Sequence, residues 1–158
     1  MATGSISPFI PVKRKPADRI GWQYARAHRD VRHFLVMDDE DIIREVVGTF
    51  ISSMGYAVLE VREGSEALQI CDEAVKKGLR ICGAILDLTV TDGMSGREAV
   101  VGLRSKYPDM PIIASSSCPE DPVMVWPTGY GFTDSIAKPF RKYELIEKLN
   151  RHLAVNSQ

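Results

Sequence analysis

Hydrophobic and polar positions along the chain follow two different periods. From residue 33 onward, short apolar runs recur, and between them lie longer stretches with apolar residues three or four positions apart. The short runs are typical of buried β-strands, and the longer spacing is typical of amphipathic helices. The runs predict strands at residues 33–37, 56–61, 81–86, 111–116 and 132–137.

The stretches between the runs predict four regular helices. In the first, apolar residues from Ile42 to Met54 form a stripe that we expect to face a sheet. In the second, we expect Ala67, Cys71 and Val75 to point inward. The predicted helices cover residues 41–54, 63–77, 96–107 and 141–153.

Residues 119–131 have a less regular pattern. Pro122 fits the first turn of a helix, but Pro127 and Gly129 predict that this helix is cut short. With this helix included, five strands alternate with five helices, which predicts a parallel sheet covered on both faces. We therefore expect a flavodoxin-like doubly wound α/β fold with strand order 2-1-3-4-5 and an irregular fourth helix.

Acidic residues follow two of the predicted strands. Asp38, Asp39, Glu40 and Asp41 come directly after the first strand, and Asp87 comes directly after the third. The expected strand order brings these two strand ends together at one edge of the sheet. Two carboxylates about 4 Å apart repel each other by roughly 4 kcal/mol at an effective dielectric constant near 20. Clustered oxygen ligands without Cys or His suit Mg²⁺, so we expect Asp38 and Asp39 to hold this metal.

Charge divides the chain near residue 33. Residues 1–33 carry seven Lys or Arg against two Asp, and residues 34–158 carry thirteen Lys or Arg against nineteen acids. A short helix is predicted within residues 17–30, and no aromatic-interleaved basic groove follows Lys13-Arg14-Lys15, so no nucleic-acid partner is expected. The predicted division is a basic arm or linker at residues 1–32, a domain at 33–154 and a tail at 155–158.

The bulk composition fits a globular domain. The chain has 158 residues, of which 44% are hydrophobic and 26% are charged. No apolar stretch approaches the length of a membrane span, and the polar, basic start is unlike a signal peptide, so we expect a cytoplasmic protein without a membrane partner. Cys71, Cys82 and Cys118 have no metal-ligand spacing and are expected to be free thiols.

Three blocks of the sequence together resemble the receiver domains of two-component response regulators. The blocks are Phe34-Leu-Val-Met-Asp-Asp-Glu40, Leu86-Asp-Leu-Thr-Val90 and Ala137-Lys-Pro-Phe140. Each block alone is weak evidence, but all three in this order within alternating strands and helices are a strong signal, and the resemblance covers about residues 33–154. The loop from Asp87 to Gly96 more narrowly resembles the receivers of hybrid sensor histidine kinases, which have a loop one residue longer.

The resemblance implies a chemical role for the acidic residues. Asp87 is the expected phosphoacceptor, whose carboxylate attacks the phosphorus of a phosphohistidine. Mg²⁺ is expected to bind Asp38, Asp39, Asp87 and the backbone carbonyl of Thr89, with Asp39 the more direct of the first two ligands. Such a metal would offset the repulsion among the acids and draw charge from the transferring group.

The resemblance also assigns two residues at the ends of later strands. Lys138 is expected to pair with Asp87 and then with a phosphoryl oxygen, and the family has a cis peptide before the proline that stands here as Pro139. Ser116 is expected to report phosphorylation through a hydrogen bond from its hydroxyl to the phosphoryl group.

Three positions depart from the family pattern. Thr91 stands where most receivers have proline, and we expect it to loosen the loop after Asp87. Ser135 stands where an aromatic ring usually rotates between inward and outward positions, so the usual coupling between Ser116 and the surface is not expected. Pro127 predicts that the usual output face is irregular.

We therefore predict a Mg²⁺-dependent phosphoacceptor of a two-component phosphorelay that is not a turnover enzyme. The expected partner is a sensor histidine kinase or a histidine phosphotransfer protein, and a weak homodimer stays open. Three alternatives remain: a degenerate receiver that binds partners without phosphorylation, a flavodoxin-like cofactor binder, and a metal-dependent phosphatase with Asp87 as its nucleophile. The lack of a Gly-rich phosphate loop after the first strand counts against the cofactor binder.

Overall fold

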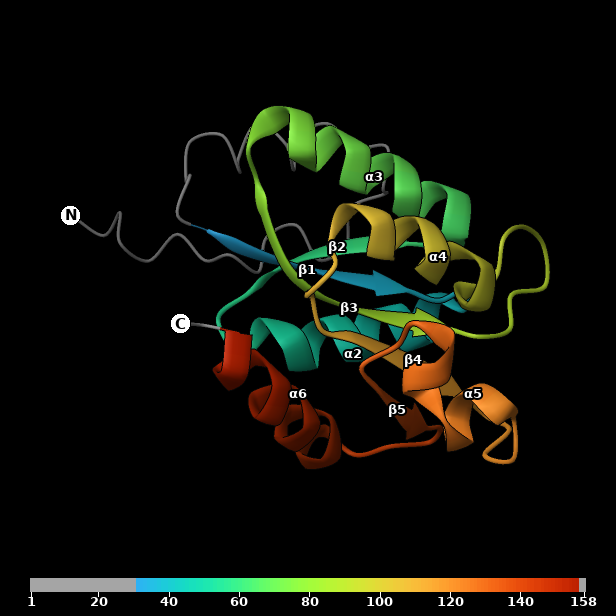
Figure 1. The fold of residues 1–158 in the computed structure, drawn as a ribbon. Coiled ribbons are helices and arrows are strands. Elements are labelled where there is room, and N and C mark those ends of the chain that lie inside the picture. The colour runs from blue at the N-terminus through green and yellow to red at the C-terminus, as the bar shows by residue number, and fades with distance from the viewer. Residues whose placement is uncertain (1–30, 157–158) are drawn as a thin grey trace.

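Five parallel strands form the sheet of the computed structural model, which describes residues 31–156 (Figure 1). The strand order is β2-β1-β3-β4-β5, which confirms the predicted topology. Residues 1–30 of the predicted N-terminal arm, with its short helix, lie outside the described residues, and Arg32, the last residue of that arm, is the first residue of β1. The strands are β1 Arg32–Met37, β2 Ala57–Val61, β3 Arg80–Asp87, β4 Ile112–Ser116 and β5 Asp134–Ala137.

Helices cover both faces of the sheet and divide the core into two layers. The α-helices are α2 Asp41–Ser52, α3 Gly64–Lys77, α4 Gly96–Lys106, α5 Pro122–Val125 and α6 Lys142–Asn156. Helices α3 and α4 pack on one face, where Ala67 and Leu103 are fully buried (Figure 1). Helices α2 and α6 pack on the other face, where Ile51 and Leu145 are fully buried. Within residues 31–156, no helix has both the length and the apolar character needed to cross a membrane.

Two helices bury narrower stripes than the sequence indicates. The prediction that Ile42, Val46 and Val75 face the sheet is wrong, because these side chains are 64%, 42% and 58% exposed. A helix lying on one face of a sheet buries only the side that contacts the strands, which in α2 contains Val47 and Ile51. Apolar residues outside that arc stay in contact with solvent.

The chain between β4 and β5 is irregular, as predicted from its prolines and glycine. Helix α5 is a single turn, and the 3₁₀-helix η3 Pro127–Tyr130 follows it. Asp121 begins α5 by accepting a hydrogen bond from the backbone N–H of Val123. Ser135 of β5 donates its hydroxyl to the carbonyl oxygen of Met124 at 2.8 Å. The side chain that replaces the usual aromatic ring therefore ties the short helix to the sheet.

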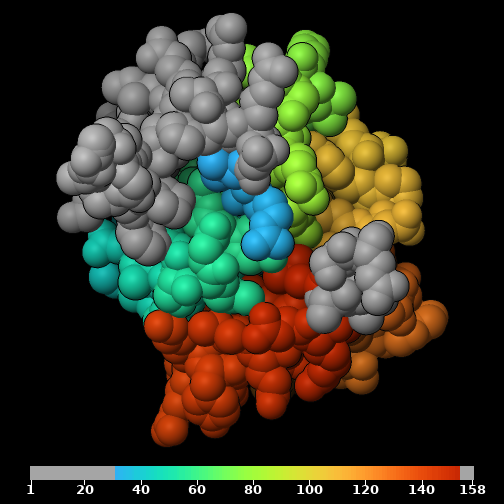
Figure 2. Space-filling model, turned by 90° about the vertical axis from the view of Figure 1, so that its left-hand side faces the viewer, coloured from blue at the N-terminus to red at the C-terminus, as the bar shows by residue number. Residues whose placement is uncertain are grey.

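Strand register brings chemically active residues to the carboxyl edge of the sheet. Asp38 follows the β1 residue that pairs with Leu86, so Asp38 comes to lie beside Asp87. Asp87 in turn pairs with Ser115 of β4, and Lys138 follows the last residue of β5. Figure 2 shows the opposite, amino-terminal edge, where the start of β1 (blue) lies in the middle of the described surface and α6 (red) lies below it.

Gly96, the first residue of α4, lies directly against the end of β3. A Cβ atom at this position would lie 2.4 Å from the carbonyl oxygen of Asp87 and 2.9 Å from the Cβ of Leu86. Both atoms belong to a buried strand that cannot move aside, so only a residue without a side chain lets α4 begin here. Ser95 caps the same helix end in a reciprocal capping box with Glu98.

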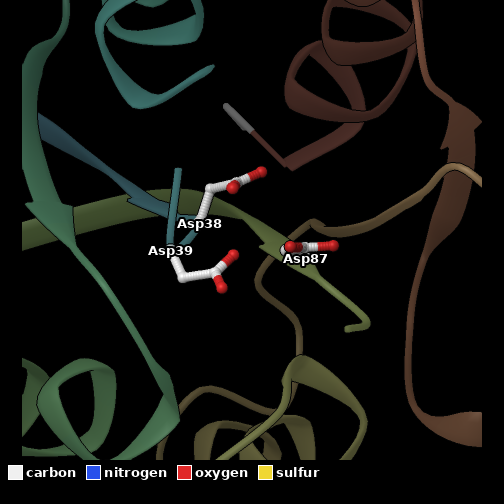
Figure 3. Close-up of side chains that lie close together, drawn as sticks. All are labelled: Asp38, Asp39 and Asp87. Carbon is white, nitrogen blue, oxygen red and sulfur yellow. The ribbon is translucent and has the colours of Figure 1, made fainter. Parts of the chain in front are cut away.

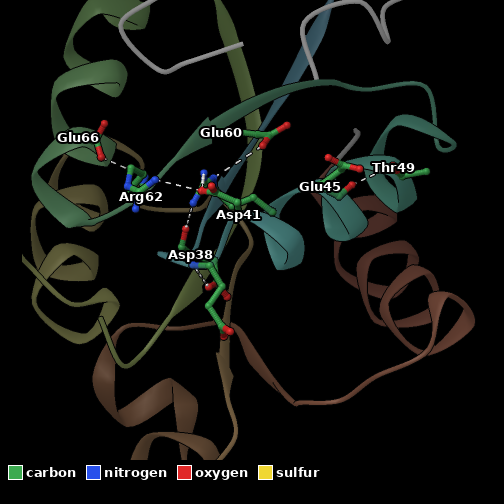
Figure 4. Close-up of polar contacts among 9 residues, drawn as sticks. Asp38, Asp41, Glu45, Thr49, Glu60, Arg62 and Glu66 are labelled. Atoms are coloured by element: carbon green, nitrogen blue, oxygen red, sulfur yellow. Dashed lines mark hydrogen bonds and ion pairs between the residues drawn. The ribbon is translucent and has the colours of Figure 1, made fainter. Parts of the chain in front are cut away.

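A network of charged side chains that includes Asp41 and Glu60 lies beside the end of β1 (Figure 4). Arg44 of α2 donates a hydrogen bond to the backbone carbonyl of Asp38 at 2.6 Å and pairs with Asp41. Its Nε lies 3.8 Å from Oε1 of Glu60 in β2. Burial raises the pKa of Glu60 to about 7, although the charge of Arg44 lowers it. The Oε2 atom of Glu60 has no hydrogen-bond partner among the described residues.

We expect Gly96→Ala to lower the free energy of unfolding by about 1–3 kcal/mol, because the new methyl group must push α4 away from β3. Gly102→Ala in the same helix is the matched control, since its Cβ would meet only the end of the Leu68 side chain. That side chain can turn away, and alanine adds about 1 kcal/mol of helix propensity. Urea unfolding measures both effects, and equal losses in the two variants would contradict the argument.

We expect the Glu60→Gln variant to gain stability over the wild type as the pH rises. The folded protein keeps a proton on Glu60 up to a pKa of about 7, whereas the ordinary value of this group is 4.5. The stability that this proton gives is complete below the unfolded value and is lost as the pH rises through 7. The gain between pH 5 and pH 8 should reach about 2–3 kcal/mol in urea unfolding. Glu147→Gln, an exposed position on α6, should show no comparable gain.

Candidate functional site

Three carboxylates meet at the carboxyl edge of the sheet. Asp38 and Asp39 follow β1 and Asp87 ends β3, and each can offer an oxygen within 4.8 Å of the others (Figure 3). Asp38 and Asp87 are buried, and Asp39 is partly exposed. The structure therefore brings together the acids that the sequence analysis placed at neighbouring strand ends.

Asp87 lies in an environment that penalises its negative charge. Burial and, after it, the charge of Asp38 raise the pKa of Asp87 to about 6, although Lys138 and the backbone N–H of Thr89 lower it. The Thr89 N–H donates a hydrogen bond to Oδ1 of Asp87 at 3.3 Å. The carboxylate is therefore mostly ionised at neutral pH but would gain from an additional positive charge.

Lys138 supplies one positive charge to this edge. Its Nζ lies 2.6 Å from Oδ2 of Asp38 and 3.4 Å from Oδ1 of Asp87. Burial lowers the pKa of Lys138, but the hydrogen bond and charge of Asp38, together with Asp87, raise it above its ordinary value. The peptide bond from Lys138 to Pro139 is cis. One ammonium group beside three carboxylates leaves an excess of negative charge.

An open pocket of about 450 Å³ gives access to these groups, and Asp39, Asp87, Thr89, Ser116 and Lys138 are among the residues that line it. Ser116 is buried, and its Oγ accepts a hydrogen bond from the backbone N–H of the neighbouring Cys118 at 3.0 Å. The hydroxyl proton of Ser116 is not used in this bond and can be donated to a group in the pocket.

The loop after Asp87 is tied to the acidic cluster at Thr91. The backbone N–H of Thr91 donates to Oδ2 of Asp39 at 3.0 Å. Burial raises the pKa of Asp39, but the hydrogen bonds of Thr91 hold it below its ordinary value. A threonine at this position keeps the backbone donor that a proline lacks, so the loop has a contact here that a proline would not allow. A residue other than proline at position 91 is the only sign of this contact in the sequence.

The donor atoms fit a hard divalent cation. The cluster of Asp38, Asp39 and Asp87 offers carboxylate oxygens and no nitrogen or sulfur ligand. Mg²⁺ prefers oxygen ligands and keeps several of its waters, which an open pocket can accommodate. A cation here would also compensate the negative charge that Lys138 leaves unbalanced.

Comparison with known proteins gives relatives that are longer than this chain. The response regulator SaeR of Staphylococcus epidermidis is 28% identical over 122 residues, which cover 77% of this chain and 50% of that protein. The uncharacterized transcriptional regulatory protein YkoG of Bacillus subtilis is 29% identical over 124 residues, which cover 78% of this chain and 52% of that protein. The chain thus spans about half the length of these relatives.

Solved structures share the fold. The receiver domain of the sensor histidine kinase PA1611 from Pseudomonas aeruginosa, with a magnesium ion coordinated in its active site cleft, matches with a TM-score of 0.67 and 23% identity over 78% of this chain and 98% of that one. The receiver domain of NtrX from Brucella abortus matches with a TM-score of 0.67 and 24% identity over 77% of this chain and 98% of that one.

The family assignment comes from the sequence model of the response regulator receiver domain, which matches residues 34–150. The matched segment runs from β1 into α6 and so contains all five strands of the sheet apart from the first residues of β1. It also contains the acidic cluster and Lys138. The chain therefore belongs to the response regulator receiver domain family.

Proposed function

We propose that this receiver domain accepts a phosphoryl group on Asp87 within a two-component phosphorelay and that it uses Mg²⁺ to do so. The donor is a phosphohistidine on a sensor histidine kinase or on a histidine phosphotransfer protein. The domain modifies its own side chain, so it is not a turnover enzyme. One observation carries the proposal: the buried Asp87 carboxylate, Asp39 and Lys138 border one open pocket, and Asp38 lies behind them in contact with Lys138.

Transfer to Asp87 needs an ionised oxygen that can reach phosphorus. An oxygen of Asp87 forms the new bond to phosphorus while the bond from phosphorus to the imidazole nitrogen breaks, and the electron pair of that bond returns to the nitrogen. A pKa of about 6 keeps Asp87 mostly ionised at neutral pH, and the pocket leaves it open to a donor. These two properties support Asp87 as the nucleophile.

Asp38, Asp39 and Asp87 would hold Mg²⁺ together with the backbone carbonyl of Thr89. Asp39 is the partly exposed member of the group, which supports it as the more direct ligand of the two acids after β1. Bound Mg²⁺ would supply positive charge to the oxygens of the transferring phosphoryl group. The magnesium ion in the PA1611 receiver domain is consistent with this choice of metal.

Lys138 and Ser116 would bind the phosphoryl group after transfer. The Lys138 ammonium already lies between Asp38 and Asp87, from where it can form a charge-assisted hydrogen bond to a phosphoryl oxygen. Ser116 lines the same pocket and has a hydroxyl proton to donate. Lys138 is held by its ion pair with Asp38, and Ser116 is buried. Both side chains are therefore in position before the phosphoryl group arrives.

An apolar surface beside the pocket suits a protein donor. Helix α2 begins at Asp41, next to Glu40 in the pocket wall, and exposes Ile42 and Val46. These two residues are four positions apart and so share one side of the helix. Exposed apolar side chains next to a reactive pocket are the type of surface that a partner protein buries. Neither a nucleic acid nor a membrane is part of this proposal.

The longer protein context is also a proposal. We place the receiver at residues 33–154, an arm or linker at residues 1–32 and a tail at residues 155–158, all in the cytoplasm. The loop from Asp87 to Gly96 supports a relationship to the receivers of hybrid sensor histidine kinases. A weak homodimer would not alter the chemistry proposed for the pocket.

Treatment with acetyl phosphate tests the acceptor directly. We expect intact mass spectrometry to show one added phosphoryl group on the wild type with Mg²⁺ and none with EDTA, because the metal has to offset the charge of the acids. Asp87→Asn should gain none. Asp92→Asn, an exposed acid in the same loop, should be labelled like the wild type.

Two outcomes would count against the proposal. Labelling that persists in Asp87→Asn would mean that another residue is the acceptor. No labelling of any sample would favour a degenerate receiver that binds its partners without phosphorylation.

A further inference from the structure

The contact between Asp39 and Thr91 joins two parts of the site that lie far apart in the sequence. The Thr91 N–H donates to Oδ2 of Asp39 at 3.0 Å, across 52 positions of the chain. Thr91 belongs to the loop that follows Asp87, and both Asp39 and Thr91 line the pocket. The contact therefore links one of the acids after β1 to the loop that starts at the end of β3.

Asp39 needs such a contact more than its two acidic neighbours do. Asp38 and Asp87 are buried and are both held by Lys138, whereas Asp39 is partly exposed. A partly exposed carboxylate can turn between several orientations, and a ligand that binds one orientation has to offset the loss of the others. The Thr91 N–H restrains the carboxylate through Oδ2.

The donor is itself presented by a restrained segment of the loop. Three residues beyond Thr91, the Met94 N–H donates to Oε2 of Glu63 at 2.8 Å, and the Met94 carbonyl accepts from the Gly64 N–H at 2.7 Å. Glu63 also caps the start of α3. Between these two points Gly93 has a φ of +113°, which lets the chain turn there. The loop is thus held at both Thr91 and Met94.

We propose that the backbone N–H of Thr91 is a positioning group for the metal site, which holds the Asp39 carboxylate in the orientation that binds Mg²⁺. The inference rests on the function proposed above and adds a residue to it. This role requires only that residue 91 is not proline, because proline has no backbone N–H. Hydrogen bonds to metal-binding side chains commonly change metal affinity by about 10- to 100-fold.

Substitutions at residue 91 distinguish the positioning of Asp39 by the backbone N–H from a general role of this residue in loop structure. We expect Thr91→Pro to weaken Mg²⁺ binding about tenfold. Thr91→Ser keeps both polar groups and should bind like the wild type, and Thr91→Ala keeps the N–H and should stay within about threefold of it. Binding is measured by titrating ¹⁵N-labelled protein with MgCl₂ and following the amide shifts of residues 87–95. An affinity of Thr91→Pro equal to that of Thr91→Ala would overturn the proposal.

A second measurement does not depend on the proline variant being folded. In wild-type protein with EDTA, we expect slow hydrogen exchange at the Thr91 amide because Asp39 accepts its hydrogen bond. Asp39→Ala should speed exchange at Thr91 and leave it unchanged at Met94, whose partner is Glu63. Exchange at Thr91 that is unprotected in the wild type, or unaffected by Asp39→Ala, would overturn the proposal.

The same titration distinguishes failure of this inference from failure of the proposed function. Wild-type protein that shows no shifts with MgCl₂ would contradict the metal site itself and with it the role of Thr91. Wild-type protein that binds Mg²⁺ while Thr91→Pro binds equally well would leave the metal site standing and remove only the positioning role.

Discussion

The ion pairs of Lys138 with Asp38 and Asp87 are the interaction on which the rest of the site depends. Two buried carboxylates at adjacent strand ends would repel each other strongly without the ammonium group between them. The parallel sheet makes their proximity unavoidable, because register places Asp38 beside Asp87. The fold thus concentrates negative charge at one edge, and the single lysine balances only part of it. A site with this imbalance is suited to groups that bring positive charge with them.

Much of this arrangement could be predicted from the sequence because it follows from strand order. Acids at the ends of the first and third strands must converge if these strands are neighbours, and Lys138 joins them from the fifth. The irregular α5 was predictable for the same kind of reason, since Pro127 cannot continue a helix. These are properties of the backbone, which the hydrophobic pattern and the prolines largely determine.

What could not be predicted depends on side-chain direction and on single hydrogen bonds. The apolar spacing of α2 and α3 did not reveal that Ile42, Val46 and Val75 lie outside the buried arc, because that arc depends on how each helix rotates against the sheet. The bond from Thr91 to Asp39 depends on the path of a loop without regular structure. The sequence shows at Ser135 only that a ring is missing, whereas the structure shows that its hydroxyl donates to the carbonyl of Met124.

The close approach of Gly96 to the end of β3 has a consequence for how this family can diversify. The strand end and the helix start touch, so the intervening residues 88–95 leave and return to nearly the same place. Adding or deleting a residue within a loop whose two ends are in contact changes the chain entropy only slightly and moves neither the strand nor the helix. The loop can therefore vary in length and sequence during evolution while the carboxylate before it and the helix after it keep their positions. New loop contacts, such as the one from Thr91, can arise without rebuilding the framework.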